Sequence, residues 1–366
     1  MERTGLFAQK VLVIAEAGVN HNGSLETALR MVEVAAEAGA GAVKFQSFHA
    51  GRLVHRAAPK AAYQLRYTQA AESQYEMLKR LELDASSQRQ LASRCRELGV
   101  GFLSSPFDLE SLAFLVDELD VEAIKIPSGE ITHGRLLWET GRSGKPCLLS
   151  TGMSTLDEVA QALGVLAFGY IQSPHPPSPE AFAEALHSEA GSWAVRRHVT
   201  LLHCTTEYPA PFHETNLRAM DTLRAAFGTP VGLSDHTEGI AAALAAVARG
   251  AVVVEKHFTL DRNLPGPDHK ASLEPPELAQ LVEGVRQVES ALGSGVKAPS
   301  PSEYKNLPIA RKSLCAARSI QRGERFSEEN LTALRPGAGV SPMRYWEYLG
   351  QLAGRDYAKG EMIDPR

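Results

Sequence analysis

The sequence predicts an α/β fold: a (β/α)₈ TIM barrel over residues 1–293, then a short linker and a small β-rich domain. Three observations support this prediction. Eight short apolar runs alternate with longer stretches of helical period. A Gly-, Pro- and Ser-rich stretch then separates the last helical stretch from the C-terminal residues. The chain has 366 residues, more than one hydrophobic core usually serves, so two domains are expected.

The eight runs resemble strands buried on both faces, because each is mainly apolar and bounded by Gly, Pro or polar residues. They are VLVIAEAG from Val11, AVKFQ from Ala42, GFLSSP from Gly101, AIKIPSG from Ala123, CLLSTG from Cys147, VTLLHCT from Val199, VGLSD from Val231 and VVVEKHF from Val252. Eight parallel strands joined by helices close a barrel. An open doubly wound sheet is the alternative. It is disfavoured because EAGVNHNG, and not a GxGxxG fingerprint, ends the first run.

Amphipathic stretches lie between the runs and predict the helices of the barrel. They include LETALRMVEVAAEAG, QRQLASRCRELG, STLDEVAQALGVLA and GIAAALAAVARG, and several end on a glycine that suits a helix C-cap. The stretch 170–199, with SPHPPSPEAF, interrupts this rhythm. We predict an insertion over the barrel face there, at a position from which substrate preference can be set.

The C-terminal part begins after the helical stretch PPELAQLVEGVRQVESALG. The sequence GSGVKAPSPSEYKN follows it and predicts a linker over residues 294–305. In residues 306–366, SIQRGERFSEEN and RDYAKGEMI share a basic–Gly–Glu turn between short strand candidates. This faint repeat indicates a small β-rich domain.

Composition and charge favour an ordinary cytoplasmic protein. Hydrophobic residues at 44% allow a packed core, and a net charge of −5 argues against a nucleic-acid or membrane-surface partner. No CxxC pair occurs among the four cysteines, which fits reduced thiols in a cytosol. The first ten residues, MERTGLFAQK, lack the apolar stretch of a signal peptide, and no window is apolar enough for a membrane span.

Polar side chains end nearly every predicted strand. Barrel enzymes carry their chemistry at the C-terminal ends of the strands, so these residues are expected to meet at one mouth. In strand order they are Glu16; Lys44 and Gln46; Ser104 and Ser105; Lys125, Ser128 and Glu130; Ser150 and Thr151; His203, Thr206 and Tyr208; Ser234, Asp235 and His236; and Glu255, Lys256 and His257.

Two lysines, Lys44 and Lys125, interrupt apolar strands. A buried ammonium group needs an anionic partner, from the protein or from a ligand. Hydroxyls at the same level complete a cradle for a phosphate and a carboxylate, and they come from Ser105, Ser128, Ser150 and Ser234. The alternative is that the lysines form buried ion pairs with Glu16, Glu130 or Glu255.

Two histidines, His236 and His257, end neighbouring strands and are expected side by side. A pair of imidazoles makes a divalent metal site plausible, with carboxylates of Asp235, Glu255 and Asp268 nearby for outer or water-mediated contacts. Only two protein ligands leave positions for water and substrate, which suits a Lewis acid better than a structural ion.

Ten ordered segments of the chain resemble the sialic acid synthases, a family that includes the legionaminic and pseudaminic acid synthases. The segments are IAEAGVNHNG, VKFQSF, SSPFD, IKIPSGE, LSTGM, HCTTEYP, GLSDHT, VEKHFTLDRNLPGPDH, RPG and GRDYAKGE. They cover nearly the whole chain. Two departures stand out: YTQAAESQYEMLK lacks the Asn-containing turn common in the family, so no sugar contact is assigned there, and Thr206 stands where the family has Asn.

The resemblance implies an antifreeze-like (SAF) domain after the barrel, and a domain-swapped homodimer in which that domain reaches the partner's active site. It implies a divalent metal, Mn²⁺ with Mg²⁺ or Co²⁺ as alternatives, on His236 and His257. Phosphoenolpyruvate would lie among Lys44, Ser105, Lys125, Ser128, Ser150 and Ser234. The sugar would contact Thr206, Tyr208, Asp268 and, from the other subunit, Arg335.

The expected reaction joins phosphoenolpyruvate to an N-acylated hexosamine, giving a nine-carbon 2-keto sugar acid and phosphate. The acceptor is N-acetylmannosamine or a 2,4-diacetamido-trideoxy hexose, and Glu16, Glu130 and Glu255 are unranked candidates for moving protons. One alternative is a Schiff-base aldolase that uses Lys125 or Lys44 without a metal. Others are a different phosphoenolpyruvate-dependent 2-keto-3-deoxy sugar acid synthase and a non-catalytic sugar-binding barrel.

Overall fold

The computed structural model describes residues 11–61, 64–65, 68 and 72–365. The first ten residues, where the sequence lacks a signal-peptide pattern, and positions 67 and 69–71 of the YTQAAESQYEMLK segment lie outside the described residues. The chain divides after Gly293 into two compact units. Each unit is described by itself.

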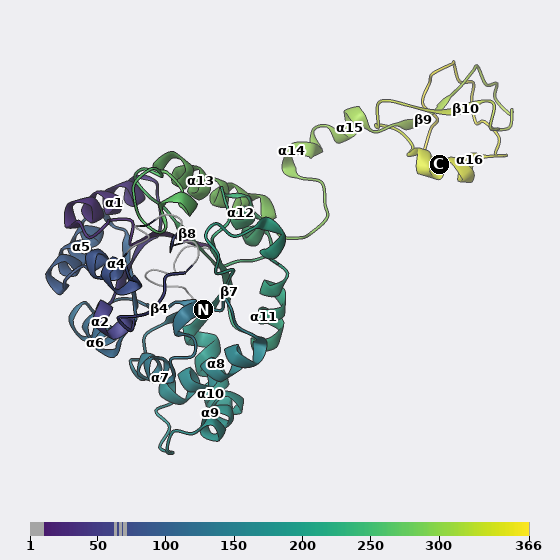
Figure 1. Cartoon of the computed structure of the whole chain (residues 1–366). Helices are drawn as coiled ribbons and strands as arrows, with labels where there is room; N and C mark the ends of the chain where they lie inside the picture. The colour runs from purple at the N-terminus through teal and green to yellow at the C-terminus, as the bar shows by residue number, and fades with distance from the viewer. Residues whose placement is uncertain (1–10, 62–63, 66–67, 69–71, 366) are drawn as a thin grey trace. The chain divides into compact units, whose positions relative to one another are not determined.

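The first unit is built on eight parallel strands, which confirms the predicted barrel (Figure 1). The strands are β1 (Leu12–Gly18), β2 (Ala42–Ser47), β3 (Gly101–Pro106), β4 (Ile124–Ile126), β5 (Cys147–Ser150), β6 (Val199–Cys204), β7 (Val231–Asp235) and β8 (Val253–His257). Their hydrogen-bonded order is β3-β2-β1-β8-β7-β6-β5-β4, and β3 and β4, at the two ends of this order, lie beside each other. The sheet therefore closes on itself, as the strand count predicted.

Alternation along the strands fills both sides of the barrel wall. Inward-facing apolar side chains, among them Leu12, Ile14 and Leu103, pack against one another and fill the centre below the mouth. Val13 and Ala15, which alternate with Leu12 and Ile14 along β1, pack outward against the helices. Both faces of each strand are thus buried, which is why the sequence shows continuous apolar runs.

Helices surround the strands as an outer ring (Figure 1). The α-helices of this unit are α1 (Leu25–Glu37), α2 (Ala50–Leu53), α4 (Gln74–Leu81), α5 (Ala85–Leu98), α6 (Leu109–Ala113), α7 (Gly134–Arg142), α8 (Leu156–Tyr170), α9 (Pro179–His187), α10 (Glu189–His198), α11 (Ala219–Phe227), α12 (Ala241–Ala248) and α13 (Pro275–Leu292). Short π or 3₁₀ turns are η2 (Phe114–Glu118), η3 (Ser128–Glu130), η4 (Phe212–Glu214) and η5 (His269–Ala271).

The helix boundaries follow capping signals in the sequence. Ser24 and Asp84 accept backbone N–H groups at the starts of α1 and α5, and Thr155 forms a capping box with Glu158 at the start of α8. Helix α5 ends at Gly99, whose φ of +69° is the left-handed conformation that glycine adopts without steric cost.

The predicted insertion lies elsewhere than expected. Residues 170–199 form the helices α9 and α10, which pack on the outer side of α8 and not over the barrel mouth (Figure 1). The rings of Phe182 on α9 and Phe168 on α8 meet edge to face, 5.1 Å apart. The prediction failed because α8 is apolar on two sides: one side faces the barrel, and the other needs a cover of its own.

The second unit contains a small antiparallel sheet and its own apolar core. Strand β9 (Ser313–Ala316) pairs with β10 (Leu331–Leu334), and the core includes Leu314, Phe326 and Tyr348. Short helical pieces are α14 (Pro301–Tyr304), α15 (Leu307–Ala310), η6 (Pro342–Arg344) and α16 (Tyr345–Tyr348). Helix α14 lies within the predicted linker 294–305 and begins with a capping box.

The faint repeat in the second unit corresponds to two turns of the same design. In each, the Glu three residues into the turn accepts the first residue's backbone N–H: Glu324 from Gln321 at 3.0 Å, and Glu361 from Ala358 at 2.8 Å. The glycine between them has a positive φ in both turns. Each turn thus satisfies a backbone N–H with a side chain, which explains the shared basic–Gly–Glu pattern.

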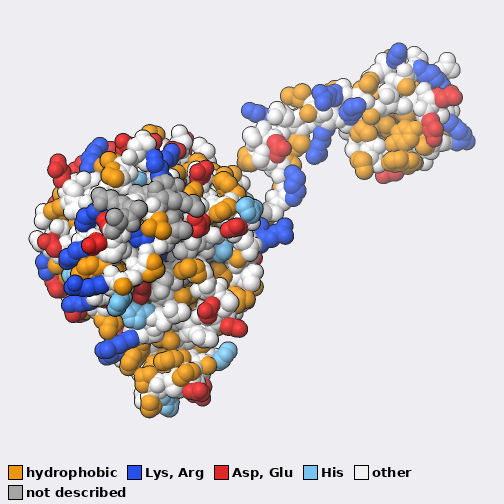
Figure 2. Space-filling view, in the orientation of Figure 1, with side chains coloured by type: hydrophobic (Ala, Val, Ile, Leu, Met, Phe, Trp, Pro, Cys, Tyr) orange, Lys and Arg blue, Asp and Glu red, His pale blue; other side chains and the backbone are white. Residues whose placement is uncertain are grey.

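Among the described residues, the helices are all too short or too polar to cross a membrane. The face of the first unit shown in Figure 2 mixes acidic and basic side chains without a large field of one sign. This mixture agrees with the small net charge of −5.

Candidate active site

One cavity of about 440 Å³ at the C-terminal ends of the strands collects the predicted site residues of the first unit. The fourteen that line it are Glu16, Lys44, Ser105, Lys125, Ser128, Glu130, Ser150, Thr206, Tyr208, Ser234, His236, Glu255, His257 and Asp268. Arg335, the remaining predicted residue, lies in the second unit, next to β10. The barrel thus brings together residues up to 252 positions apart in sequence, because all its strands end at the same mouth.

Four charged side chains alternate in sign at the floor of the cavity. Lys44 Nζ lies 2.7 Å from Glu16 Oε2 and 3.8 Å from Glu255 Oε2. Lys125 Nζ lies 3.1 Å from Glu255 Oε1. Both lysines are therefore paired with protein carboxylates, as the alternative reading of the strands proposed. Glu130 takes no part in this cluster, because its Oε2 contacts Nδ1 of His133 at 2.8 Å.

The charge cluster shifts the pKa values of its two glutamates in opposite directions. Burial raises the pKa of Glu16 above its ordinary value, against the opposing effect of Lys44. Glu255 is as deeply buried, but Lys125 and Lys44, helped by a 2.8 Å hydrogen bond from Ser234 Oγ, outweigh burial and lower its pKa. Burial would lower the pKa of Lys44, but Glu16 and Glu255 outweigh it and raise that pKa.

The two histidines lie side by side at one wall of the cavity. The rings of His236 and His257 are 5.5 Å apart, and the ring of Tyr208 lies 4.2 Å from that of His236. Burial lowers the pKa of His236 to about 4, and burial together with His236 lowers the pKa of His257 further below its ordinary value. Both imidazoles are therefore neutral near pH 7 and carry a lone pair.

One hydrogen bond fixes the tautomer of His236. Nδ1 of His236 donates to the backbone oxygen of Thr205 at 2.7 Å, which leaves Nε2 as the acceptor nitrogen. Nδ1 of His257 is buried without a hydrogen-bond partner, and Asp268 Oδ2 lies 3.9 Å from it. Burial raises the pKa of Asp268 to about 6. An imidazole oriented by a carbonyl is the arrangement found in metal-binding histidines.

Several buried polar atoms of the cavity lack a hydrogen-bond partner in the chain. Besides Nδ1 of His257, they include the hydroxyls of Ser150 and Thr206. Buried polar groups are nearly always satisfied in folded proteins, so unsatisfied ones that share a cavity indicate a site for a polar ligand.

Asp235 directly precedes His236, as expected, but its side chain does not face the cavity. It lies on the opposite face of β7 from Ser234 and His236, and it pairs with Lys256, away from the cavity. Side chains alternate along a strand, so neighbours in sequence point to opposite faces. Among the described residues, no group of three or more His, Cys, Asp or Glu side chains is arranged to hold a metal.

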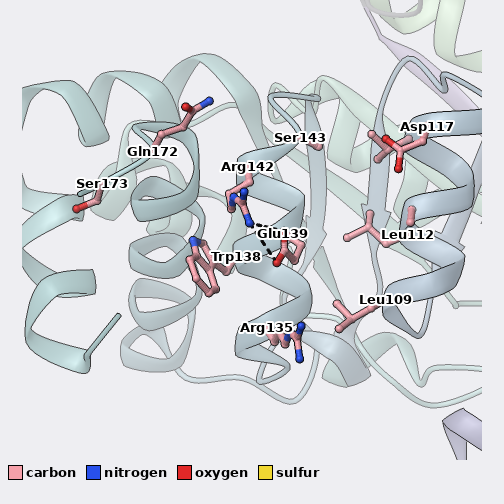
Figure 3. Close-up of a pocket in the computed structure, with 12 residues that line it drawn as sticks. Leu109, Leu112, Asp117, Arg135, Trp138, Glu139, Arg142, Ser143, Gln172 and Ser173 are labelled. Carbon is pink, nitrogen blue, oxygen red and sulfur yellow. Dashed lines mark hydrogen bonds and ion pairs between the residues drawn. The ribbon is translucent and has the colours of Figure 1, made fainter. Parts of the chain in front are cut away.

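A larger hollow of about 750 Å³ lies between α6 and α7 on the outer wall (Figure 3). Leu109, Leu112 and Trp138 contribute apolar surface to it. Its Arg142 is already engaged, with Glu139 at 3.2 Å and with the ring of Trp138. The hollow has none of the buried, unpartnered polar atoms of the mouth, so the chemistry is assigned to the mouth.

Comparison with known proteins agrees with this geometry. The NeuB family matches residues 31–297, more than half of the chain. The chain belongs to the NeuB family. A SAF domain matches residues 311–365 of the second unit, which confirms the predicted antifreeze-like domain. The resemblance to the sialic acid synthases is thereby confirmed as well.

Relatives of this NeuB-family chain include enzymes named for one sugar acid. The N,N'-diacetyllegionaminic acid synthase of Campylobacter jejuni is 49% identical over 97% of this chain and 99% of its own length. The protein of the same name from Legionella pneumophila is 41% identical over 96% of this chain and 92% of its own length. The crystal structure of the sialic acid synthetase from Leptospira borgpetersenii, at 33% identity, covers 81% of this chain and 90% of that one with a TM-score of 0.65.

Some residues of the cavity escaped sequence reasoning. Gln74 lines it, although no contact had been assigned to the ESQYEMLK segment, and Gln64 lines it from the same excursion between β2 and α5. Met153 follows β5 with a φ of +61° and also borders the cavity. Strand-end reasoning could not find the glutamines, because they come from a long connection that folds back over the mouth. The unusual length of that connection was the available signal.

Proposed function

We propose that this NeuB-family chain condenses phosphoenolpyruvate with a 2,4-diacetamido-trideoxy hexose to give a nine-carbon, legionaminic-type 2-keto acid and phosphate. One observation carries the proposal: a single cavity joins two lysines, two glutamates whose pKa values shift in opposite directions and two neighbouring imidazoles. The identities of 49% and 41% to N,N'-diacetyllegionaminic acid synthases, against 33% to a sialic acid synthetase, favour the diacetamido acceptor over N-acetylmannosamine.

The donor binds where positive charge and hydroxyls meet. Lys44 and Lys125 attract the phosphate and carboxylate of phosphoenolpyruvate, and Ser105, Ser128, Ser150 and Ser234 offer hydroxyls around them. Of these, Ser150 has a hydroxyl without a partner in the chain. Positioning and charge stabilisation are the main contributions of such a cradle to catalysis.

The two imidazoles fit a divalent metal, and Mn²⁺ is the ion we propose. Nε2 of His236 and the unpartnered Nδ1 of His257 are the candidate ligand atoms, with the remaining positions left to water and substrate. A bound Mn²⁺ would act as a Lewis acid toward the acceptor aldehyde. Thr206, Tyr208 and Asp268 lie beside these histidines and are proposed to bind and orient the sugar.

The reaction forms a carbon–carbon bond and a carbon–oxygen bond to water, and it breaks the carbon–oxygen bond to phosphate. C3 of phosphoenolpyruvate attacks the aldehyde carbon of the open-chain hexose, and the aldehyde oxygen takes up a proton. Water then adds at C2 and loses a proton, and phosphate leaves as the 2-keto group forms. Glu16 is the candidate to move these protons, because its pKa is raised, whereas Glu255 stays ionised beside two lysines.

The Schiff-base alternative is disfavoured by the same charge cluster. A lysine nucleophile needs a neutral amine, which enzymes obtain by lowering the lysine pKa. Glu16 and Glu255 raise the pKa of Lys44, and Glu255 pairs with Lys125 at 3.1 Å. Lys44 is therefore held as an ammonium group, and Lys125 is engaged in an ion pair with a carboxylate.

Assembly completes the proposal. We include a homodimer in which the second unit of one chain supplies Arg335 to the sugar site of its partner. Arg335 is the one proposed sugar-binding residue outside the barrel, and the N–H groups of a guanidinium can donate to the hydroxyl and amide oxygens of such a sugar.

Phosphate release from phosphoenolpyruvate tests the proposal. EDTA-treated enzyme is assayed with and without Mn²⁺, against the 2,4-diacetamido-trideoxy hexose and N-acetylmannosamine, and the product is identified by mass spectrometry. Metal-dependent release with the diacetamido sugar and a nine-carbon acid supports the proposal. Preference for N-acetylmannosamine would make that sugar the acceptor in place of the diacetamido hexose. Pyruvate trapped on a lysine by borohydride, in an enzyme indifferent to EDTA, would overturn it.

A further inference from the structure

A buried ion pair lies directly behind the two histidines. Lys256 Nζ contacts Asp235 Oδ2 at 2.8 Å, and both side chains are 0% exposed. The two residues stand opposite each other in the register of β7 and β8. Neither lines the mouth cavity, although the residues on either side of each one do. The pair therefore fastens the two strand ends from the outside of the barrel wall.

The same aspartate shapes the turn that carries His236. Asp235 Oδ1 accepts the backbone N–H of Thr237 at 2.9 Å and the Thr237 hydroxyl at 2.8 Å. Lys256 also donates to the backbone oxygen of Thr237. The turn from residue 235 to 237 is thus closed by a ring of hydrogen bonds centred on Lys256, and His236 is its middle residue.

Strand alternation links this ring to the mouth. His236 directly follows Asp235, and His257 directly follows Lys256, so the two imidazoles face the cavity while the ion pair faces the helices. The ring centroids of the histidines are 5.5 Å apart. A change in the distance between Asp235 and Lys256 would therefore change the separation of the two imidazoles, because each histidine is the next residue along its strand.

Stability alone does not account for a pair of this kind. Removing two charges from water costs about as much as their attraction returns, so apolar residues of similar size are often equally stabilising. What an apolar pair lacks is a fixed donor–acceptor geometry. Metal ligands depend on such geometry, because the groups behind them set the orientation of each ligand atom.

We propose that Asp235 and Lys256 are positioning residues that set the spacing of His236 and His257 for a divalent cation. The inference rests on the proposed function insofar as it takes these histidines as ligands. It adds residues that do not touch the substrate or the metal and that act through the backbone of β7 and β8.

Mn²⁺ binding to the substrate-free, EDTA-treated protein is the test, measured by calorimetric titration together with thermal unfolding. The main variant is the double substitution Asp235→Leu with Lys256→Met, which leaves no buried charge unpaired. We expect cooperative unfolding to be kept and Mn²⁺ affinity to fall by about tenfold or more, as it does when groups behind metal ligands are removed. The Mn²⁺ concentration for half-maximal phosphate release should rise in parallel.

Two further variants keep the result interpretable. Thr237→Val removes one hydrogen bond of the ring without touching a charge, so it should fold and weaken Mn²⁺ binding by a smaller factor. Leu166→Ala opens the core at α8, at a residue that does not line the mouth cavity, and should lower thermal stability with unchanged Mn²⁺ affinity. If both the double variant and Thr237→Val bind Mn²⁺ with wild-type affinity, the inference about positioning is wrong, but the proposed metal site stands. Absence of Mn²⁺ binding by the wild type would overturn it together with the proposed metal site.

Discussion

Glu16 and Glu255 show how two identical side chains acquire pKa shifts of opposite direction. They lie on adjacent strands and share Lys44, at 2.7 and 3.8 Å. Glu255 has Lys125 and Ser234 as further partners, whereas Glu16 has Lys44 as its main counter-charge. Burial therefore dominates at Glu16 and the lysines dominate at Glu255. A carboxyl group with a raised pKa is suited to exchanging protons near neutral pH.

Replacing Glu16 by Gln should lower kcat by about 100-fold or more, the usual contribution of a positioned acid–base group. The substitution keeps the shape of the side chain, so thermal stability serves to exclude misfolding. Glu130→Gln is the comparison, because Glu130 lines the cavity but pairs with His133 at 2.8 Å. Steady-state phosphate release measures both. A normal kcat for Glu16→Gln combined with a large loss for Glu130→Gln would reassign the proton carrier.

Gly152 marks a point where the cavity wall has no room for a side chain. A Cβ there would lie 2.4 Å from Thr206 Oγ1 and 2.8 Å from both Cys204 Sγ and Ser128 Oγ. Gly152→Ala should therefore displace the proposed sugar and donor contacts and lower kcat/KM by about tenfold, a loss of about 1.4 kcal/mol. Gly134→Ala is a matched control, since nothing lies within 4 Å of its Cβ position and Gly134 does not line the cavity. Equal kinetics for the two variants would contradict this placement.

At the scale of elements, the insertion stabilises the barrel from outside. Helices α9 and α10 both contact α8, and none of their residues lines the mouth cavity. Close backbone approach holds the layers together, because a Cβ on Gly164 of α8 would lie 2.8 Å from the backbone oxygen of Phe182. We therefore expect the insertion to affect stability and not substrate choice.

Phe182→Ala tests this assignment. Loss of the ring from the contact with Phe168 should lower the free energy of unfolding by about 3 kcal/mol, the low end for a buried aromatic residue, because Phe182 is only partly buried. The KM for both substrates should stay unchanged. Chemical denaturation and steady-state kinetics measure the two effects, and a shifted acceptor KM at normal stability would restore a role for the insertion in specificity.

His21, in the loop after β1, makes the stability of the folded chain depend on pH. This side chain is 1% exposed, and burial lowers its pKa to about 4. Between pH 6.5 and 4 the unfolded chain binds a proton at this position and the folded chain does not, so stability falls as the pH decreases. A shift of about 2.5 pKa units corresponds to roughly 3 kcal/mol, lost in full by about pH 4.

His21→Gln should reduce this acid dependence of the unfolding free energy, measured by denaturant titration between pH 7 and 4. Stability of the variant at pH 7 will itself be lower if the hydrogen bond from the Gly23 backbone to Nδ1 is lost, so the slope with pH is the informative quantity. His187→Gln, at an exposed position on α9, should leave the slope unchanged. An unaltered slope in His21→Gln would show that other groups carry the acid sensitivity.

At the scale of the whole molecule, the two units each have their own core, and only the second carries Arg335. The proposed dimer predicts that two inactive variants can complement each other. Arg335→Ala and His236→Gln should each abolish most activity when alone. If Arg335 acts across the dimer, a mixed dimer of the two variants has one site with both residues intact.

Mixing equal amounts of the two variants, under conditions that allow subunits to exchange, should therefore restore about a quarter of wild-type phosphate release for random pairing. Each variant taken alone through the same exchange procedure is the control. Full exchange without recovery would place Arg335 in the active site of its own chain, or outside the site altogether.

The sequence by itself determined the barrel and most of its mouth. Apolar runs such as β1 and β7 are strands because both their faces are buried, and this requirement is written in the composition of each run. The positions of Lys44 and His257 in the mouth followed from the rule that barrel strands end together. Capping residues such as Thr155 placed helix starts, because capping is a local interaction.

Tertiary structure alone decided the rest, because it depends on distances between residues far apart in the chain. Whether Lys125 faces a ligand or Glu255, and which glutamate keeps a raised pKa, is set by how four strands bring their side chains to one floor. The outward direction of Asp235 and the outer position of α9 also depend on which surfaces remain to be covered after the barrel closes. Local patterns specify each element, but charge pairing and the covering of surfaces are properties of the assembled fold.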